Sequence, residues 1–175
     1  MDYFVLDSSH IVEEYITVSD ELKDISLNCC ASEFQYLTKD SREIILKEKT
    51  GTIWPDFIYE NGIPLVSKRM KDFLVYNGID YLFYKKIILK KDYSSEEHEY
   101  WLALPAKINC LNLENSIIDD LLGTVEHFVI DNKRVGRYEI FKLAGVTNLE
   151  IIITESLADK IKKEKFIGVY ILKLK

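Results

Sequence analysis

The stretch Glu96-Glu97-His98-Glu99 holds the side chains of this chain that are best suited to chemistry, because three carboxylates surround one imidazole. Such groups bind divalent metals and transfer protons. A metal ion needs ligands that converge from separate parts of a fold, and consecutive residues rarely do so alone. We therefore favour a solvated loop between two strands. A small metal-dependent hydrolase that uses His98 with nearby acids stays open as an alternative function.

Other catalytic candidates have weaker support. The sequence contains no Gly-x-Ser-x-Gly elbow, no phosphate-binding Gly-x-x-x-x-Gly-Lys loop and no Gly-x-Gly-x-x-Gly motif. Cys110 with His127 is a formal nucleophile and base pair, but Cys110 fits a strand face better. His10 and His127 have no partner motif around them. The sequence thus predicts no enzyme, no cofactor and no metal site.

Charge limits the choice of partner. The chain has 23 basic and 29 acidic residues and a net charge of −6, which disfavours nucleic acid and favours a basic partner. Lys68, Arg69 and Lys71 follow a predicted helix start, where a phosphate could bind. Basic residues on a helix usually face solvent, which is the interpretation we favour here.

The 175 residues, of which 47% are hydrophobic, predict a single domain with an ample core. Three cysteines, Cys29, Cys30 and Cys110, without metal-site spacing favour a reduced compartment. Neither a signal-peptide core nor an uncharged apolar run of about 20 residues is present. We expect a cytoplasmic protein without a membrane partner.

The segment from Trp54 to Gly78 has the clearest local signals. Strands are expected at Asp56–Tyr59 and Ile63–Val66 on either side of an Asn-Gly turn. Ser67 should then cap a helix whose apolar positions are Met70, Phe73, Leu74 and Tyr76. Gly78 should end the helix in a left-handed conformation, and a strand should follow over Ile79–Leu89.

The end of the chain repeats this plan. A buried strand at Ile151–Ile153 precedes the cap Thr154, and Leu157, Ala158 and Ile161 form an apolar stripe. Gly168 precedes a strand over 169–174. These two strand–helix–strand units predict an α+β fold with a mixed, mainly antiparallel sheet and few short helices.

Several further elements are expected with fewer signals. Ser19 should cap a helix over Asp20–Leu27. Ser116 and Asp119 resemble a capping box that opens a short helix to Leu122. Strands are expected at Tyr100–Ala103 and Ile108–Leu113, and a hairpin is expected around Asp131–Arg134.

With these elements in place, the segments Trp54-Pro55-Asp56-Phe57, Gly62-Ile63-Pro64-Leu65-Val66-Ser67 and Gly78-Ile79 resemble the "PDF…GxPLVS…L…GI" core of a bacterial immunity-protein family, the eleventh numbered. The segments Glu139–Leu143, Ile151–Leu157 and Phe166–Val169 resemble its closing pattern. This family belongs to polymorphic toxin systems. The resemblance implies a single immunity-type domain over 1–175, with a family core at 53–174 and a less constrained section at 1–49.

The resemblance also implies an intracellular antidote, which binds a cognate secreted toxin stoichiometrically and is not an enzyme. An oligomerising scaffold or regulatory module that pairs through exposed strand edges stays open as a second alternative function. A homodimer also stays open as an assembly of this chain. Some motif residues have backbone reasons for their positions and are expected to define the fold: Pro55, Asp56, Gly62, Pro64, Ser67, Gly78, Thr154 and Gly168. We expect toxin contacts at exposed acidic residues: Glu96, Glu97, Glu99, Asp119 and Asp120.

Overall fold

The computed structural model divides the chain into two compact units. The structure describes residues 2–8, 14–18, 42–46, 51–60, 62–91, 95–119 and 121–174. The first unit comprises Met1–Leu6, Pro105–Glu164 and Ile171–Lys175, and the second comprises Asp7–Leu104 and Lys165–Tyr170. Each unit is thus assembled from segments far apart in the sequence. The single-domain expectation stays a prediction.

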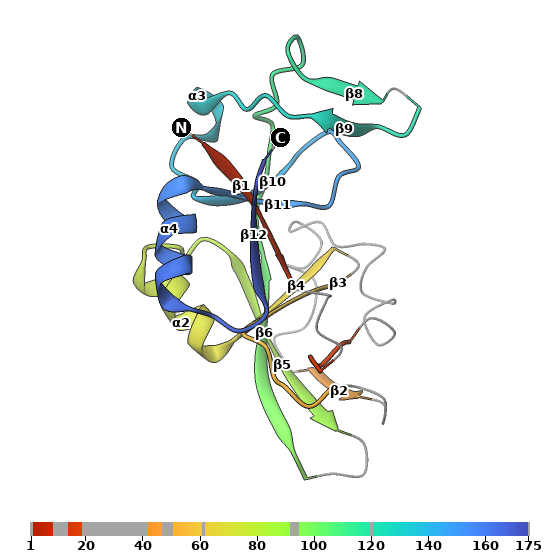
Figure 1. The fold of residues 1–175 in the computed structure, drawn as a ribbon, viewed down its shortest axis with the longest axis vertical. Coiled ribbons are helices and arrows are strands. Elements are labelled where there is room, and N and C mark those ends of the chain that lie inside the picture. The colour runs from red at the N-terminus through yellow and green to blue at the C-terminus, as the bar shows by residue number, and fades with distance from the viewer. Residues whose placement is uncertain are drawn as a thin grey trace. The chain divides into compact units, whose positions relative to one another are not determined.

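The first unit contains a five-stranded sheet (Figure 1). Its strands, in spatial order, are β12 (Val169–Lys173), β1 (Tyr3–Ser8), β11 (Ile151–Thr154), β10 (Ile140–Leu143) and β7 (Lys107–Ile108). Strand β11 runs antiparallel to both β1 and β10, whereas β7 is parallel to β10. Every residue of β10 and β11 is buried. Ile151–Ile153 of β11 form the continuous apolar run expected at the centre of a sheet, whereas β10 includes the buried Lys142.

Helix α4 (Glu155–Glu164) follows β11, as the sequence predicts. The Thr154 Oγ1 accepts a hydrogen bond of 3.4 Å from the backbone N–H of Leu157, which confirms the predicted cap. Leu157, Ala158 and Ile161 are buried, so the predicted stripe is also confirmed. The core of this unit includes Phe141 and Ile152.

Two local predictions in the first unit are wrong because side-chain caps serve turns there. The described residues between Ser116 and Leu122 form no helix; β8 (Ile117–Asp119) pairs antiparallel with β9 (Thr124–His127). The Ser116 hydroxyl accepts from the backbone N–H of Val129 instead of capping a helix. The expected hairpin at Asp131–Arg134 is the one-turn helix α3 (Asn132–Val135), capped by the Asp131 side chain.

The strand predicted at Ile108–Leu113 is also shorter than expected. Strand β7 ends at Ile108, and the backbone N–H of Cys110 turns back to the carbonyl of Ile108 at 3.0 Å. Leu111 forms only an isolated bridge with Ile130. The local turn therefore ends the ladder before the apolar run ends.

The second unit contains another five-stranded sheet. Its strands, in spatial order, are β2 (Arg42–Leu46), β5 (Phe83–Lys91), β6 (Glu97–Leu104), β4 (Ile63–Ser67) and β3 (Phe57–Glu60). Strand β2 is parallel to β5, and the remaining neighbours are antiparallel. Together the sheets confirm the predicted α+β fold, with mixed, mainly antiparallel sheets and short helices.

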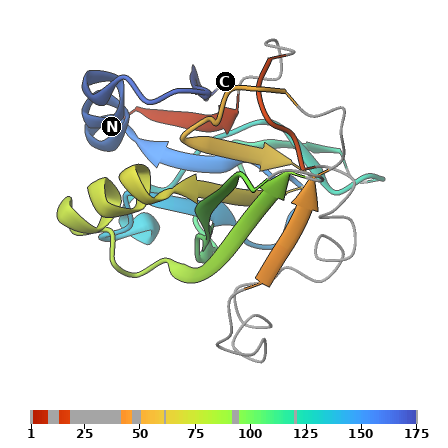
Figure 2. The ribbon, with the colours of Figure 1, turned by 90° about the horizontal axis from the view of Figure 1, so that it is seen from below.

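One side of this second sheet carries the core of the unit. Ile58, Leu65, Ile87 and Leu102 lie there, with Trp54 packed against them. Helix α2 (Lys68–Tyr76) packs against β4 and β6 (Figure 2). The predicted β3–β4 hairpin is confirmed, and Gly62 has a φ of 80° in its turn, while Asn61 lies outside the described residues.

The ends of α2 also match prediction. The Ser67 Oγ accepts from the backbone N–H of Met70 at 3.1 Å, and Gly78 has a φ of 81°. Met70 and Leu74 are buried, but Tyr76 is 91% exposed and does not belong to the apolar face.

The strand after α2 begins later than predicted, at Phe83 rather than Ile79. The backbone N–H of Ile79 bonds to the carbonyl of Leu74 at 2.9 Å, and Ile79 is buried at the helix end. Ile79 therefore packs at the end of α2 instead of pairing with another strand. The helix predicted at Asp20–Leu27, with its cap Ser19, lies outside the described residues.

Candidate functional site

The acidic stretch at 96–99 is not a loop, contrary to the sequence-based expectation. Strand β6 begins at Glu97, which pairs with Lys90, and Glu99 pairs with Ile88. Successive side chains of a strand point to opposite faces. His98 therefore lies on the core side of the sheet, while Glu97 and Glu99 lie on the other side. These polar residues form a strand because they pair with β5 over the whole length of β6.

His98 and Glu96 belong to a packed cluster around Trp54. The His98 ring stacks on Trp54 with centroids 3.9 Å apart, and the Trp54 Nε1 donates to Glu96 Oε1 at 2.6 Å. The Lys91 Nζ lies 3.3 Å from Glu96 Oε2. The Trp54 hydrogen bond, assisted by Lys91 and His98, lowers the pKa of Glu96. Packing against Trp54 is therefore a sufficient explanation for the positions of His98 and Glu96. Among the described ranges, no three His, Cys, Asp or Glu residues are grouped to hold a metal.

On the other side of the sheet, glutamates alternate with lysines. Glu99 forms an ion pair with Lys86, and Glu97 lies 3.4 Å from the Nζ of Lys90. The Trp101 Nε1 also donates to Glu99 at 3.1 Å. The hydrogen bond from Lys86 lowers the pKa of Glu99. Each proposed contact residue on this strand therefore has a lysine beside it, which reduces the net negative charge of this surface.

A pH titration tests the Lys86–Glu99 pair. Because the folded-state pKa of Glu99 is lowered, its stabilisation is present above the ordinary value of 4.5 and is lost as the pH falls through the lowered pKa. We expect Glu99→Gln to reduce the free energy of unfolding by less than about 1 kcal/mol at pH 7, and by less still near pH 3. Urea unfolding at both pH values measures this difference. In a Lys86→Met background the effect should vanish; an unchanged effect there contradicts the pairing.

Asp56 is the centre of a polar network in the second unit. Its Oδ1 accepts from the Ser67 hydroxyl at 2.6 Å, and its Oδ2 accepts from Arg69 at 3.0 Å and from the backbone N–H of Ile167 at 2.9 Å. The carboxylate is buried. It thus joins the residue before β3 to the start of α2 and to the segment before β12.

Neighbouring motif residues also serve the backbone. The Tyr100 hydroxyl donates to the carbonyl of Pro55 at 2.5 Å, and burial raises the pKa of Tyr100. A Cβ at Gly168 would lie 2.5 Å from the Cβ of Pro55. Pro64 pairs with Tyr59 in the β3–β4 ladder. We infer that these residues position segments of the fold.

The basic residues at the start of α2 are occupied by protein groups. The Lys68 Nζ lies 2.5 Å from Asp72, and the Arg69 guanidinium lies over the Phe166 ring at 4.5 Å. The Lys71 Nζ lies 3.7 Å above the Trp101 ring. With Asp56 already beside Ser67, this helix start gives no support to a phosphate site.

Cys110 fills a core position, as the sequence predicts. It is fully buried, and burial raises the pKa of its thiol to about 11. His127, the formal base, is exposed on β9. The His10 side chain and the Cys29–Cys30 pair lie outside the described residues.

Thiol labelling tests this assignment. Because the thiolate is the reactive form, Cys110 should remain unmodified by iodoacetamide at pH 8 in the folded protein. The same peptide should be alkylated within minutes after unfolding in guanidinium, as measured by mass spectrometry. Equal labelling in both states would show that Cys110 is accessible.

Asp119 holds the turn between β8 and β9. Its Oδ1 accepts from the backbone N–H groups of Leu121 and Leu122 at 2.8 and 3.0 Å. Both leucines are exposed. Asp120 lies outside the described residues. The sequence-based capping-box interpretation missed this turn; the acids followed by Leu-Leu-Gly were the available signal.

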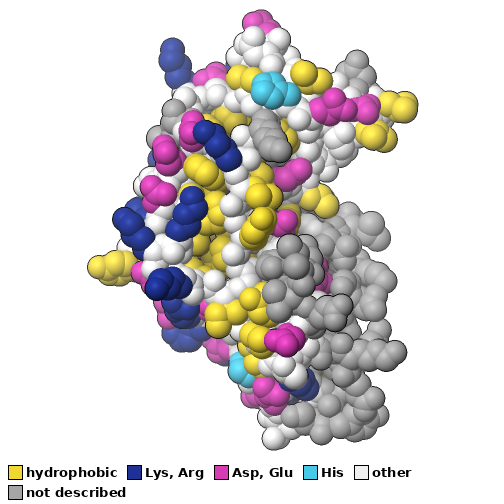
Figure 3. Space-filling model, viewed as in Figure 1, with side chains coloured by type: hydrophobic (Ala, Val, Ile, Leu, Met, Phe, Trp, Pro, Cys, Tyr) yellow, Lys and Arg dark blue, Asp and Glu magenta, His cyan; other side chains and the backbone are white. Residues whose placement is uncertain are grey.

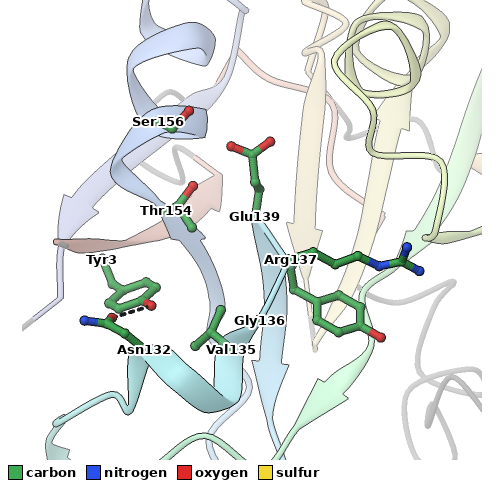
Figure 4. Close-up of a pocket in the computed structure, with 9 residues that line it drawn as sticks. Tyr3, Asn132, Val135, Gly136, Arg137, Glu139, Thr154 and Ser156 are labelled. Atoms are coloured by element: carbon green, nitrogen blue, oxygen red, sulfur yellow. Dashed lines mark hydrogen bonds between the residues drawn. The ribbon is translucent and has the colours of Figure 1, made fainter.

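A cavity of about 350 Å³ lies in the first unit (Figure 4). Some of its polar groups contact other protein groups. The Tyr3 hydroxyl donates to Asn132 Oδ1 at 2.7 Å. The Glu139 Oε2 lies 3.8 Å from the Lys160 Nζ. In Figure 4 the Arg137 side chain points away from Tyr3 and Thr154. These lining residues therefore give no support to a ligand site in the cavity.

The elements described above define an α+β protein whose motif residues Asp56, Ser67 and Gly168 make contacts within the fold. The chain matches the model of the immunity protein family Imm11 over residues 8–175. It belongs to this immunity protein family, which confirms the resemblance seen in the sequence. No curated protein matches the chain. Within the described ranges, the helices are too short or too polar for one to span a membrane.

Proposed function

We propose that this protein binds a cognate secreted bacterial toxin domain and neutralises it by stoichiometric protein–protein contact, without enzymatic turnover. The family match over residues 8–175 carries this proposal. We further propose that it acts in the cytoplasm, with a protein partner and no cofactor. Nucleic acid and membrane are not proposed as partners.

Physical considerations support a protein interface. A stable complex of this kind buries about 1,600 Å² of total surface, with a few anchor residues that dominate its free energy. The net charge of −6 would favour association with a basic toxin. The motif residues are occupied inside the fold, so we propose that contacts come from exposed residues outside the motif, including the acidic candidates named above.

Titration of a purified toxin domain tests both binding and stoichiometry. The probe is the toxin domain encoded beside this chain, whose activity should fall linearly with added protein and reach its minimum near one equivalent. Co-expression should also restore growth of cells that produce the toxin. Complete inactivation at a small fraction of an equivalent would indicate turnover. Undiminished toxicity and no complex in size-exclusion chromatography would refute the proposed function.

A further inference from the structure

We propose that the turn between β8 and β9 is the anchor that enters the toxin. We define the hairpin tip as Asp119, Leu121 and Leu122. The inference rests on the proposed function and adds the contact surface and its chemistry. The occupant is a toxin domain that presents an apolar pocket surrounded by basic side chains.

Exposed apolar side chains are concentrated at this place. In the described ranges, 11 large hydrophobic residues are exposed, and four of them lie between 113 and 122. Leu121 is 92% exposed and Leu122 is 62% exposed. Hydrophobic side chains stand at the outer end of the hairpin in Figure 3. Leu121 and Leu122 are adjacent on the turn, whereas Leu113 precedes β8 and Ile117 lies at the other end of the hairpin. Scattered exposed leucines are ordinary, but two adjacent ones on one turn are typical of an interaction site.

Several hydrogen bonds within the first unit brace the described residues of the tip. Besides the two bonds from Asp119 Oδ1, the Asp119 carbonyl accepts from the Gly123 N–H at 2.7 Å. The hydroxyl of Thr147 donates to the Leu122 carbonyl at 2.9 Å, and its N–H donates to the Gly123 carbonyl at 3.0 Å. Gly123 has a φ of 67°, which a glycine adopts without strain. A preformed turn loses little conformational entropy when its leucines become buried.

The charge around the tip specifies the partner. Residues 108–132 contain five acids, namely Glu114, Asp119, Asp120, Glu126 and Asp131, and neither lysine nor arginine. Glu114 and Glu126 are exposed, and within the described part of the chain Glu114, Asp119 and Glu126 form no ion pair. Asp131 is paired with Arg134 at 3.3 Å, so the uncompensated negative charge belongs to Glu114, Asp119 and Glu126, in contrast to the lysine-paired glutamates of β6. Such a field favours and accelerates docking onto a basic surface.

The double variant Leu121→Ser/Leu122→Ser tests the anchor directly. Both side chains are exposed, so the melting temperature should stay near that of the unmodified protein. We expect the Kd for the inactivated toxin domain encoded beside this chain to rise at least about 30-fold, as for hot-spot residues. The matched control is Tyr76→Ser on α2, which is equally exposed and should leave the Kd within about twofold. Surface plasmon resonance measures both.

A second variant tests the charge separately. Glu114→Gln/Glu126→Gln should slow association several-fold at low salt and leave dissociation nearly unchanged, because peripheral charges act mainly on encounter. An unchanged association rate would show that the side chains around the toxin's apolar pocket are not basic.

The outcomes separate the two levels of inference. If the unmodified protein binds the toxin and the leucine variant binds equally well, the tip is not the anchor and the proposed function stands. Loss of binding in Glu97→Lys/Glu99→Lys with unchanged binding in the leucine variant would move the site to β6. If the leucine variant changes only the oligomeric state in light scattering, the tip is a self-association surface. If the unmodified protein does not bind, the proposed function itself fails.

Discussion

Replacing Asp56 with alanine is expected to lower the free energy of unfolding by about 3 kcal/mol, because the change removes the acceptor of three hydrogen bonds. The Ser67 hydroxyl and the Ile167 N–H lose their acceptor in a part-buried setting. Arg69 is half exposed and can be solvated, so its share of the loss is smaller. Urea unfolding followed by circular dichroism measures the change.

The matched control is Asp72→Ala, which removes an equally charged side chain from the exposed pair with Lys68. Exposed pairs contribute little, so this variant should cost less than about 0.5 kcal/mol. Equal effects of the two substitutions would show that Asp56 does not organise the network described above.

Gly168→Ala is expected to destabilise the protein by about 3 kcal/mol, through two effects that add. The backbone φ of 77° is unfavourable for alanine by roughly 1–2 kcal/mol. The new Cβ would also lie 2.5 Å from the Pro55 Cβ and 3.3 Å from the Phe57 carbonyl, so neighbouring backbone must shift, which adds roughly 1–3 kcal/mol.

Gly78→Ala separates these two effects. Gly78 has a similar φ of 81°, but a Cβ there meets no atom within 4 Å. It should therefore show only the conformational cost of about 1 kcal/mol. Chemical denaturation of both variants gives the comparison, and a Gly168→Ala effect no larger than that of Gly78→Ala would mean that the segment before β12 can move away from Pro55.

The parts of the fold that the sequence predicts are those with local causes. The side chains of Ser67 and Thr154 accept hydrogen bonds from N–H groups three residues away, so each cap can be predicted without knowledge of the fold. The apolar stripe of α4 likewise follows from helical spacing. Such signals locate both strand–helix–strand units.

The errors occur where a distant partner decides the local structure. The Ser116 hydroxyl bonds to Val129, 13 residues away, which turns an apparent capping box into a hairpin. Strand β6 extends back to Glu97 because β5 offers a ladder there. The parallel pairing of β2 with β5 has no local signature either.

The candidate contact residues show the same division. Composition identifies the acids of β6, but their lysine partners become evident only when β5 lies beside them. The exposure of Leu121 and Leu122 depends on the turn made by Asp119, which the sequence alone did not distinguish from a helix start. The acidic residues could be counted from the sequence, but the lysines that pair with them could not be identified from it.

The division of the chain between the units has a consequence for biosynthesis. Each unit includes a segment near the end of the chain, with Lys165–Tyr170 in one and Ile171–Lys175 in the other. The Asp56 network, for example, needs the N–H of a residue 111 positions later. Neither unit can therefore complete its contacts on the ribosome until nearly the whole chain has emerged. At roughly 5–20 residues per second, a nascent chain spends about 6–20 seconds between Asp56 and Ile167. During that interval it is incomplete and exposed to chaperones and proteases.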